Sequence, residues 1–288
     1  MLYIGEYTPN NRKKRQAIYP AVDTSTFLQT HRVFNLDEAV QALAPSGGRK
    51  ATLERLKYAA ARGKLKKLAR GVYASVPPGV EPAKFQPDRF LAAAALRPDA
   101  IFSHHSALEL LGAAHSEWRL CTAYSVRRSQ RFDLGGLELR FLTHPQPLLR
   151  QKATELGTRS VYRLDRELCT TGPERTLIDG FRRPDLVGGL EEFVESAAGF
   201  SVLELPLLFE LLDVFGQKVL WAAVGWFLDT YRATFFVSDD DLTFMKKNVP
   251  RAPLYLARDQ RGGVLVHGWN LIVPGALVEG KEPDETQR

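Results

Sequence analysis

The chain has very little cysteine and no long hydrophobic run. Its two cysteines among 288 residues, Cys121 and Cys169, each lie in an apolar stretch. Two cysteines do not form a disulfide scaffold, so we expect buried thiols in a reducing compartment. No run of about 18 uncharged apolar residues occurs, which predicts that no helix spans a membrane. The N-terminus has its charges after its apolar residues and lacks a cleavage-site pattern, so we expect no secretory signal and a cytoplasmic protein.

The sequence motifs of common enzyme classes are also missing. The sequence contains no P-loop, no dinucleotide-binding glycine pattern, no Gly-x-Ser-x-Gly and no paired Cys-x-x-Cys. His104 and His105 are adjacent, so on a helix they do not share the i, i+4 spacing of a metal site. We expect one of them to pack or to hydrogen-bond at the domain surface. Arg175 and Asp179 are four residues apart, which favours a structural ion pair over a catalytic role. We therefore expect no enzyme, no metal and no cofactor.

The charge that is present is unevenly distributed. Apolar residues make up 44% of the chain and charged residues 25%, which is typical of a globular protein. Residues 1–75 hold 14 basic and 5 acidic residues, a net charge of +9, whereas the rest of the chain has a net charge of −3. A basic excess confined to one end indicates a nucleic-acid-binding module attached to a neutral body.

A basic helix followed by a basic hairpin is predicted within this end of the chain. Residues 49–62 show helical spacing of apolar side chains, and Gly63 suits the left-handed backbone that ends a helix. Two short runs, 64–68 and 71–74, flank a turn-forming Ala-Arg-Gly. This order predicts a winged helix-turn-helix, with the helix in a major groove and the hairpin along the DNA backbone. The alternative is a solvated basic helix on an ordinary small domain.

Two groups of side chains in this segment are candidates for DNA contact. Arginine and lysine donate to guanine O6 and N7, and threonine serves a base or a phosphate. The predicted base readers are Arg49, Lys50, Thr52 and Arg55. The predicted phosphate contacts are Lys57, Arg62, Lys64, Lys66, Lys67 and Arg70.

Five segments are predicted along the chain. They are a basic arm (1–22), the winged helix-turn-helix (23–76), a proline-rich linker (77–87), a C-terminal domain (88–278) and a disordered tail (279–288). In the arm, Arg12, Lys13, Lys14 and Arg15 either reach a minor groove or phosphates, or form a solvated tail. We place helices at 24–31, capped by Thr24 or Ser25, and at 35–43, capped by Asn35.

The C-terminal domain is predicted to mix helices and strands. Asp88 starts a helix over 89–97, and Ser103 caps a second one over 104–111. Strand-like runs then extend from 118 to 171, with Gly135-Gly136 as a tight hairpin turn. Helices return at Pro173, and a last hairpin pairs 254–257 with 263–266. The predicted fold class is α+β, with an N-terminal winged helix-turn-helix and a mixed α/β C-terminal domain.

Three sequence blocks resemble the AbiEi-type antitoxins, the regulator half of bacterial abortive-infection toxin–antitoxin operons. They lie at 63–73, 101–112 and 173–179, and the segment 269–274 fits the end of such proteins. The resemblance implies a DNA-binding winged helix and a C-terminal antitoxin domain. It also implies that the protein binds double-stranded DNA at repeats in the promoter of its own operon and represses it. The implied partner is a nucleotidyltransferase-like toxin, which the antitoxin counteracts.

Two other classes of function stay open at this point. One is a nuclease or nucleotidyl-modifying enzyme that its N-terminal domain delivers to DNA. The other is a protein-interaction module whose basic end binds an acidic protein. Copies of a repressor often pair on repeated sites, so a homo-oligomer on DNA is compatible with the sequence, although no coiled-coil seam is present.

Overall fold

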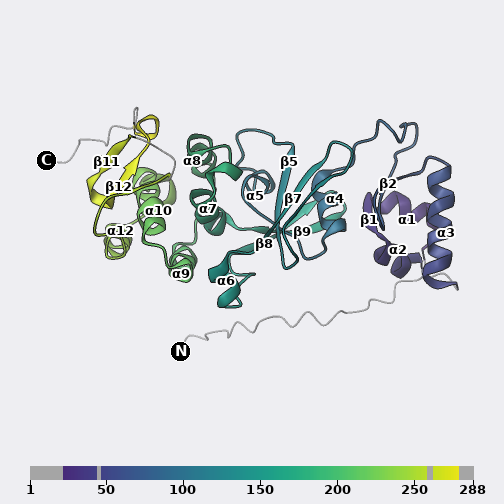
Figure 1. Ribbon diagram of the computed structural model, residues 1–288, viewed down its shortest axis with the longest axis horizontal. Coiled ribbons are helices and arrows are strands. Elements are labelled where there is room, and N and C mark those ends of the chain that lie inside the picture. The colour runs from purple at the N-terminus through teal and green to yellow at the C-terminus, as the bar shows by residue number, and fades with distance from the viewer. Residues whose placement is uncertain (1–21, 44–46, 258–261, 279–288) are drawn as a thin grey trace.

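The structure, a computed structural model, describes residues 22–43, 47–257 and 262–278. In this part of the chain, twelve α-helices and three β-sheets form a mixed α+β fold, in agreement with the predicted class. The elements follow one another along an elongated molecule (Figure 1). Three clusters of buried apolar side chains define an N-terminal, a middle and a C-terminal part.

The N-terminal part consists of three helices and a small antiparallel sheet. Its elements are α1 (Thr24–Thr30), β1 (Val33–Asn35), α2 (Leu36–Leu43), α3 (Gly48–Ala61), β2 (Leu65–Ala69) and β3 (Val72–Ser75). The strand order is β1-β3-β2. Phe27, Phe34, Leu56 and Tyr73 are buried between the helices and one face of the sheet. Their burial fixes α3 against the sheet.

Side-chain caps set the starts of the first two helices. Asp23 caps α1, since its carboxylate accepts a hydrogen bond of 2.8 Å from the Ser25 amide. The predicted caps, Thr24 and Ser25, instead lie inside the helix. Asn35 caps α2 as predicted, since its side-chain oxygen accepts from the Glu38 amide at 2.9 Å, and the Glu38 carboxylate in turn accepts from the Asn35 amide at 2.8 Å. The sequence does not predict β1, because three residues are too few to show an alternating pattern.

A mixed six-stranded sheet forms the middle part. Its elements are α4 (Arg89–Leu96), β4 (Ile101–Phe102), α5 (His105–Leu110), β5 (Leu120–Ser125), β6 (Gln130–Asp133), β7 (Glu138–Thr143), α6 (Gln146–Arg150), β8 (Thr158–Arg163) and β9 (Arg166–Thr171). The strand order is β6-β7-β5-β4-β9-β8. Gly135 and Gly136 join β6 to β7 with φ angles of 70° and 91°, so the predicted hairpin turn is confirmed. Asp88 caps α4 through the Phe90 amide, also as predicted.

The start of α5 differs from the prediction. Ser103 does not cap the helix, since the residue before α5 is His104, whose φ is 57° and whose side chain makes no capping bond. The Ser103 hydroxyl lies instead 2.9 Å from Nδ1 of His104. The prediction that one of the two histidines packs or hydrogen-bonds at the domain surface is wrong about the surface, because both His104 and His105 are buried. The central strand β4 leads directly into α5, and this connection carries both side chains inward.

Helices dominate the C-terminal part. They are α7 (Pro173–Arg182), α8 (Leu190–Ala198), α9 (Leu205–Phe215), α10 (Lys218–Thr230), α11 (Arg232–Phe235) and α12 (Asp239–Lys246). A small sheet of β10 (Leu254–Tyr255), β11 (Val264–Val266) and β12 (Leu271–Val273) completes it. The predicted hairpin of β10 and β11 is wrong, because β12 lies between them and pairs with both. Short strands separated by a turn do not reveal a third strand that inserts from later in the chain.

The predicted linker does not separate independent cores. Residues 77–87 form neither helix nor strand, as expected. Val33, Val72 and Ala74, on the second face of the N-terminal sheet, are nevertheless buried in the same cluster as Phe90 and Leu91 of α4. The helix α4 therefore serves as a shared layer between the N-terminal sheet and the middle sheet. The apolar surface buried there fixes the two parts to each other.

Polar contacts reinforce this junction. Arg166 Nη2 donates to a Glu38 carboxylate oxygen at 2.9 Å and to the Val33 carbonyl at 3.2 Å. The Arg32 amide donates to Asp165 at 2.7 Å. Both Asp165 and Arg166 lie at the β8–β9 turn, so this turn of the middle part is hydrogen-bonded to the N-terminal part.

Some predictions fall outside the described residues. They are the basic arm with Arg12, Lys13, Lys14 and Arg15, and the tail 279–288. Among the residues that are described, no helix has both the length and the apolar composition needed to cross a membrane.

Candidate nucleic-acid interface

The helix α3 has one buried and one exposed face. Thr52, Leu56 and Ala59 are buried and share the side of the helix that packs on the N-terminal core. In Figure 1, α3 lies at one end of the elongated molecule, on the outer side of the N-terminal part. Its other face is thus available to an external partner.

Thr52 belongs to the buried face, which contradicts its prediction as a base reader. Its side chain has no exposed surface, and its hydroxyl donates to the Gly48 carbonyl at 3.2 Å. It lies four residues before Leu56, so it shares the inner side of the helix with this leucine. The sequence pattern placed Thr52 with the charged residues because threonine is polar. Burial of a polar hydroxyl is unfavourable when it has no partner, but the Thr52 hydroxyl is hydrogen-bonded within the helix and can therefore be buried.

The other three predicted base readers are exposed on α3. Arg49 forms an ion pair with Asp37 of α2, in which the side chains are 58% and 82% exposed. Such an exposed pair contributes at most about 1 kcal/mol, so an external acceptor can replace Asp37. Lys50 and Arg55 are exposed, and neither forms an ion pair with any described residue. Arg49, Lys50 and Arg55 keep the accessibility that the prediction requires.

The later part of α3 carries two of the predicted phosphate contacts. Lys57 lies 2.8 Å from Glu54, and this hydrogen bond and charge raise the pKa of the Lys57 ammonium. The Arg62 guanidinium lies 4.6 Å from the ring centroid of Tyr58, which is itself 61% exposed. Both cations therefore stay at the surface, each next to a side chain that orients it.

The hairpin carries four more predicted phosphate contacts, and one of them is not free to bind DNA. Lys64, Lys67 and Arg70 are exposed. Lys66, by contrast, is half-buried, and its Nζ donates to the Phe85 carbonyl at 2.6 Å. The prediction of Lys66 as a phosphate contact is therefore wrong, because its ammonium group is hydrogen-bonded to the linker segment 77–87 and holds this segment against β2. Gly71 has a φ of 76° at the hairpin turn and its carbonyl accepts from the Leu36 amide, so the turn lies at the start of α2.

The buried charges elsewhere agree with one prediction. Arg175 Nε and Asp179 Oδ2 lie 3.7 Å apart on α7, and both side chains are fully buried, so the predicted pair is confirmed. Asp179 also accepts from Arg182 at 3.1 Å. Two carbonyl oxygens, of Thr154 and Leu156, accept from Arg175 Nη1. This network stabilises the position of α7 against the loop before β8.

A second cationic site was missed by the sequence reasoning. Arg131 and Arg140 are directly opposite each other on β6 and β7, beside a pocket. A signal for this pair existed. Each arginine lies four residues from the Gly135-Gly136 turn, and a tight hairpin at that turn places them opposite each other.

Within the described ranges, no three His, Cys, Asp or Glu side chains lie close enough together to hold a metal ion.

Comparison with known proteins shows a fold likeness. No family model matches the chain, and no curated protein matches it in sequence. The crystal structure of the Rv2827c protein from Mycobacterium tuberculosis is similar in fold, with a TM-score of 0.56 over 86% of this chain and 89% of that chain. The two are 16% identical in sequence, so the likeness concerns the fold alone.

Proposed function

We propose that residues 23–76 form a winged helix-turn-helix that binds double-stranded DNA, and that the protein is a transcriptional repressor of its own operon. The observation that carries the proposal is the exposed face of α3, where Arg49, Lys50 and Arg55 face away from a buried core. Two helices before α3 and an antiparallel hairpin after it give the order of elements of that motif.

The side chains divide into two roles in this proposal. Arg49, Lys50 and Arg55 lie in the first half of α3 and contact base edges in a major groove. Phosphates are bound by cations from the end of the helix and from the hairpin, namely Lys57, Arg62, Lys64, Lys67 and Arg70. The protein acts through binding, without catalysis, in the cytoplasm.

We also propose that the protein is an antitoxin. The support is the resemblance of the blocks at 63–73, 101–112 and 173–179 to AbiEi-type antitoxins. The expected partner is a nucleotidyltransferase-like toxin, and paired copies on promoter repeats fit the same resemblance. Co-expression with the neighbouring gene tests this role: growth arrest by the neighbour alone should be relieved by this protein. Arrest that persists in the presence of this protein contradicts the antitoxin proposal.

DNA binding is tested by fluorescence anisotropy with the full chain. One duplex is taken from upstream of its own gene, and a second has the same bases in scrambled order. We expect preferential binding of the upstream duplex, with affinity that falls by about 10³-fold or more between about 50 and 200 mM salt if six or more phosphates are neutralised. An absence of salt-dependent binding to both duplexes overturns the proposal.

Two variants and one control separate the roles of the cations. Arg55→Ala should weaken binding to the upstream duplex by about 1–3 kcal/mol and reduce the preference over the scrambled duplex. Lys67→Ala should weaken binding to both duplexes alike. Arg251→Ala is the matched control, because Arg251 is exposed and lies between α12 and β10, far along the chain from α3. Equal losses on both duplexes for Arg55→Ala would show that Arg55 does not read bases.

A further inference from the structure

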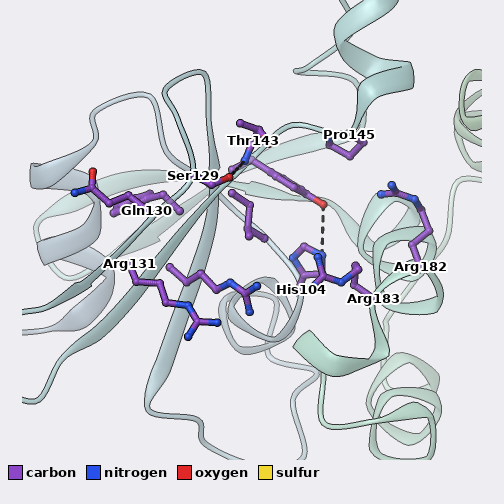
Figure 2. Close-up of a pocket in the computed structure, with 12 residues that line it drawn as sticks. His104, Ser129, Gln130, Arg131, Thr143, Pro145, Arg182 and Arg183 are labelled. Atoms are coloured by element: carbon purple, nitrogen blue, oxygen red, sulfur yellow. Dashed lines mark hydrogen bonds between the residues drawn. The ribbon is translucent and has the colours of Figure 1, made fainter. Parts of the chain in front are cut away.

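A pocket of about 500 Å³ opens on the middle part of the molecule, away from α3. One wall is formed by the hairpin of β6 and β7, and the other by the end of α7. Figure 2 shows Arg131 on the strand side and Arg182 and Arg183 on the helix side, with His104 between them. A volume of this size is within the range of about 300–1,000 Å³ that is typical of small-molecule sites.

The side chains that line the pocket carry positive charge only. Four guanidinium groups line it, and no Asp or Glu is among the lining residues. Arg183 is held by Asp185 through two hydrogen bonds, and Arg182 is held by Asp179. Neither of these two acids is among the lining residues, whereas both arginines are.

On the strand side, no acid of the described residues lies within ion-pair distance of either arginine, and Asp185 attracts Arg140 only at longer range. Arg131 and Arg140 are directly opposite on neighbouring antiparallel strands, and within the described residues neither side chain makes an ion pair or a hydrogen bond. Like charges in this position repel each other and destabilise a sheet. Partial burial and the neighbouring Arg131 lower the pKa of Arg140. A bound anion would turn this repulsion into attraction, because both groups would then share a counter-charge.

The floor of the pocket contains a residue in a strained conformation. His104 lies at the connection from β4 to α5 and has backbone angles φ 57° and ψ −132°, which residues other than glycine rarely adopt. Such strain is retained where a fold needs a side chain at a fixed place, and it is frequent at ligand sites. The ring is held on both sides, with Nδ1 2.9 Å from the Ser103 hydroxyl and Nε2 3.4 Å from the Tyr124 hydroxyl. The pocket thus combines a rigid polar floor with cationic walls.

We propose that this pocket binds a small phosphate-bearing anion, up to the size of a nucleoside diphosphate. The guanidinium group is planar and presents paired donors that match phosphate oxygens, and four arginines line the pocket from two walls. Arg131 and Arg140 contact the phosphate first, since within the described residues neither guanidinium group is hydrogen-bonded to a carboxylate. The concave shape and the buried His104 favour a small ligand over a nucleic-acid strand, which needs an open groove. This inference does not depend on DNA binding by α3.

The test is isothermal titration calorimetry on the full chain, with pyrophosphate and ADP as separate probes at constant ionic strength. We expect saturable binding of at least one probe with one equivalent per chain. The double variant Arg131→Gln/Arg140→Gln should weaken it by at least about tenfold, the loss expected when charged hydrogen bonds disappear. Arg251→Gln is the control and should bind as the wild type does.

Two further arms decide the remaining outcomes. If the glutamine variant does not fold by circular dichroism, Arg131→Lys/Arg140→Lys replaces it; this variant keeps both charges but loses the paired donors, so binding must still weaken. A short single-stranded oligonucleotide is the third probe. Absence of saturable binding by pyrophosphate and ADP, or binding that the arginine substitutions leave unchanged, overturns the proposal. Binding of the oligonucleotide alone through these arginines likewise overturns the small-ligand assignment.

Discussion

At the scale of single residues, burial decides what a polar side chain does. The sequence predicts both Thr52 and Lys66 as DNA contacts. Thr52, however, is on the buried face of α3, and the Lys66 ammonium donates to the Phe85 carbonyl. Asp179 shows that a buried charged side chain in turn depends on its partners. It is fully buried with Arg175 and Arg182 as partners, and a charge there is tolerated only because those partners are present.

Removal of the Asp179 charge should therefore destabilise the protein strongly. Asp179→Asn leaves Arg175 buried without its counter-charge, and we expect the free energy of unfolding to fall by about 3–5 kcal/mol. Urea denaturation measures this change. Asp185→Asn is the control, because Asp185 is 57% exposed and its pair with Arg183 should contribute no more than about 1 kcal/mol. Similar losses in the two variants would contradict a special role for the buried network.

His104 should make stability depend on pH. Burial lowers the pKa of His104 from 6.5 to about 4. As the pH falls, the unfolded chain therefore binds this proton before the folded chain does, so the contribution of His104 to stability is fully present above pH 6.5 and is lost as the pH falls toward 4. In His104→Asn this part of the decline should be absent. Urea midpoints at several pH values between 4 and 7 test it, and parallel curves for the two proteins would refute it. His144, whose pKa burial also lowers to about 4, contributes equally to both curves.

At the scale of elements, local signals set most of the boundaries. The Asn35 cap, proline at the start of α7 and the Gly135-Gly136 turn all lie where the sequence places them. These signals depend on backbone hydrogen bonds and φ angles within a few residues, so they do not need the rest of the chain. Elements formed by distant pairing, such as the sheet of β10, β12 and β11, were not predicted correctly.

Glu38 has two roles in α2 that substitutions can separate. Glu38→Gln keeps an acceptor for the Asn35 amide but loses the charge that pairs with Arg166. We expect a loss of at most about 1 kcal/mol, since this ion pair is partly exposed. Glu38→Ala also removes the cap bond, so a total loss of about 1–2 kcal/mol is expected. Thermal or urea denaturation ranks the two variants, and equal stability of Ala and Gln variants would show that the cap bond contributes nothing.

At the scale of the whole molecule, the N-terminal part packs against the middle part through a shared hydrophobic core. Val33, Val72 and Ala74 share a core with Phe90 and Leu91, and the β8–β9 turn adds polar contacts. An N-terminal part fixed in this way keeps its orientation relative to the rest of the molecule, whereas a part on a flexible tether would not.

Because of this shared core, we expect the N-terminal part and the rest of the chain to remain associated after the segment 77–87 is cleaved. A protease site is inserted after Gly79, which is exposed in the segment 77–87. After cleavage, both fragments should elute together in size-exclusion chromatography because the shared core is intact. The same cut in a Phe90→Ala variant, which removes a buried aromatic ring from that core, should release more of the N-terminal fragment. Complete separation of the wild-type fragments would contradict the shared core.

The sequence by itself determined the starts of α2, α4 and α7, the Gly135-Gly136 turn, the α+β fold class and the position of the basic helix. These features follow from local backbone preferences and from the spacing of apolar residues, which any short segment carries. Only the tertiary structure decided the burial of Thr52 and His104, the insertion of β12 between β10 and β11, and the joined cores at α4. It also brought Arg182 and Arg183 of α7 to the same pocket as Arg131 and Arg140. Contacts of this kind depend on which distant surfaces pack together, and no local pattern of residues records that choice.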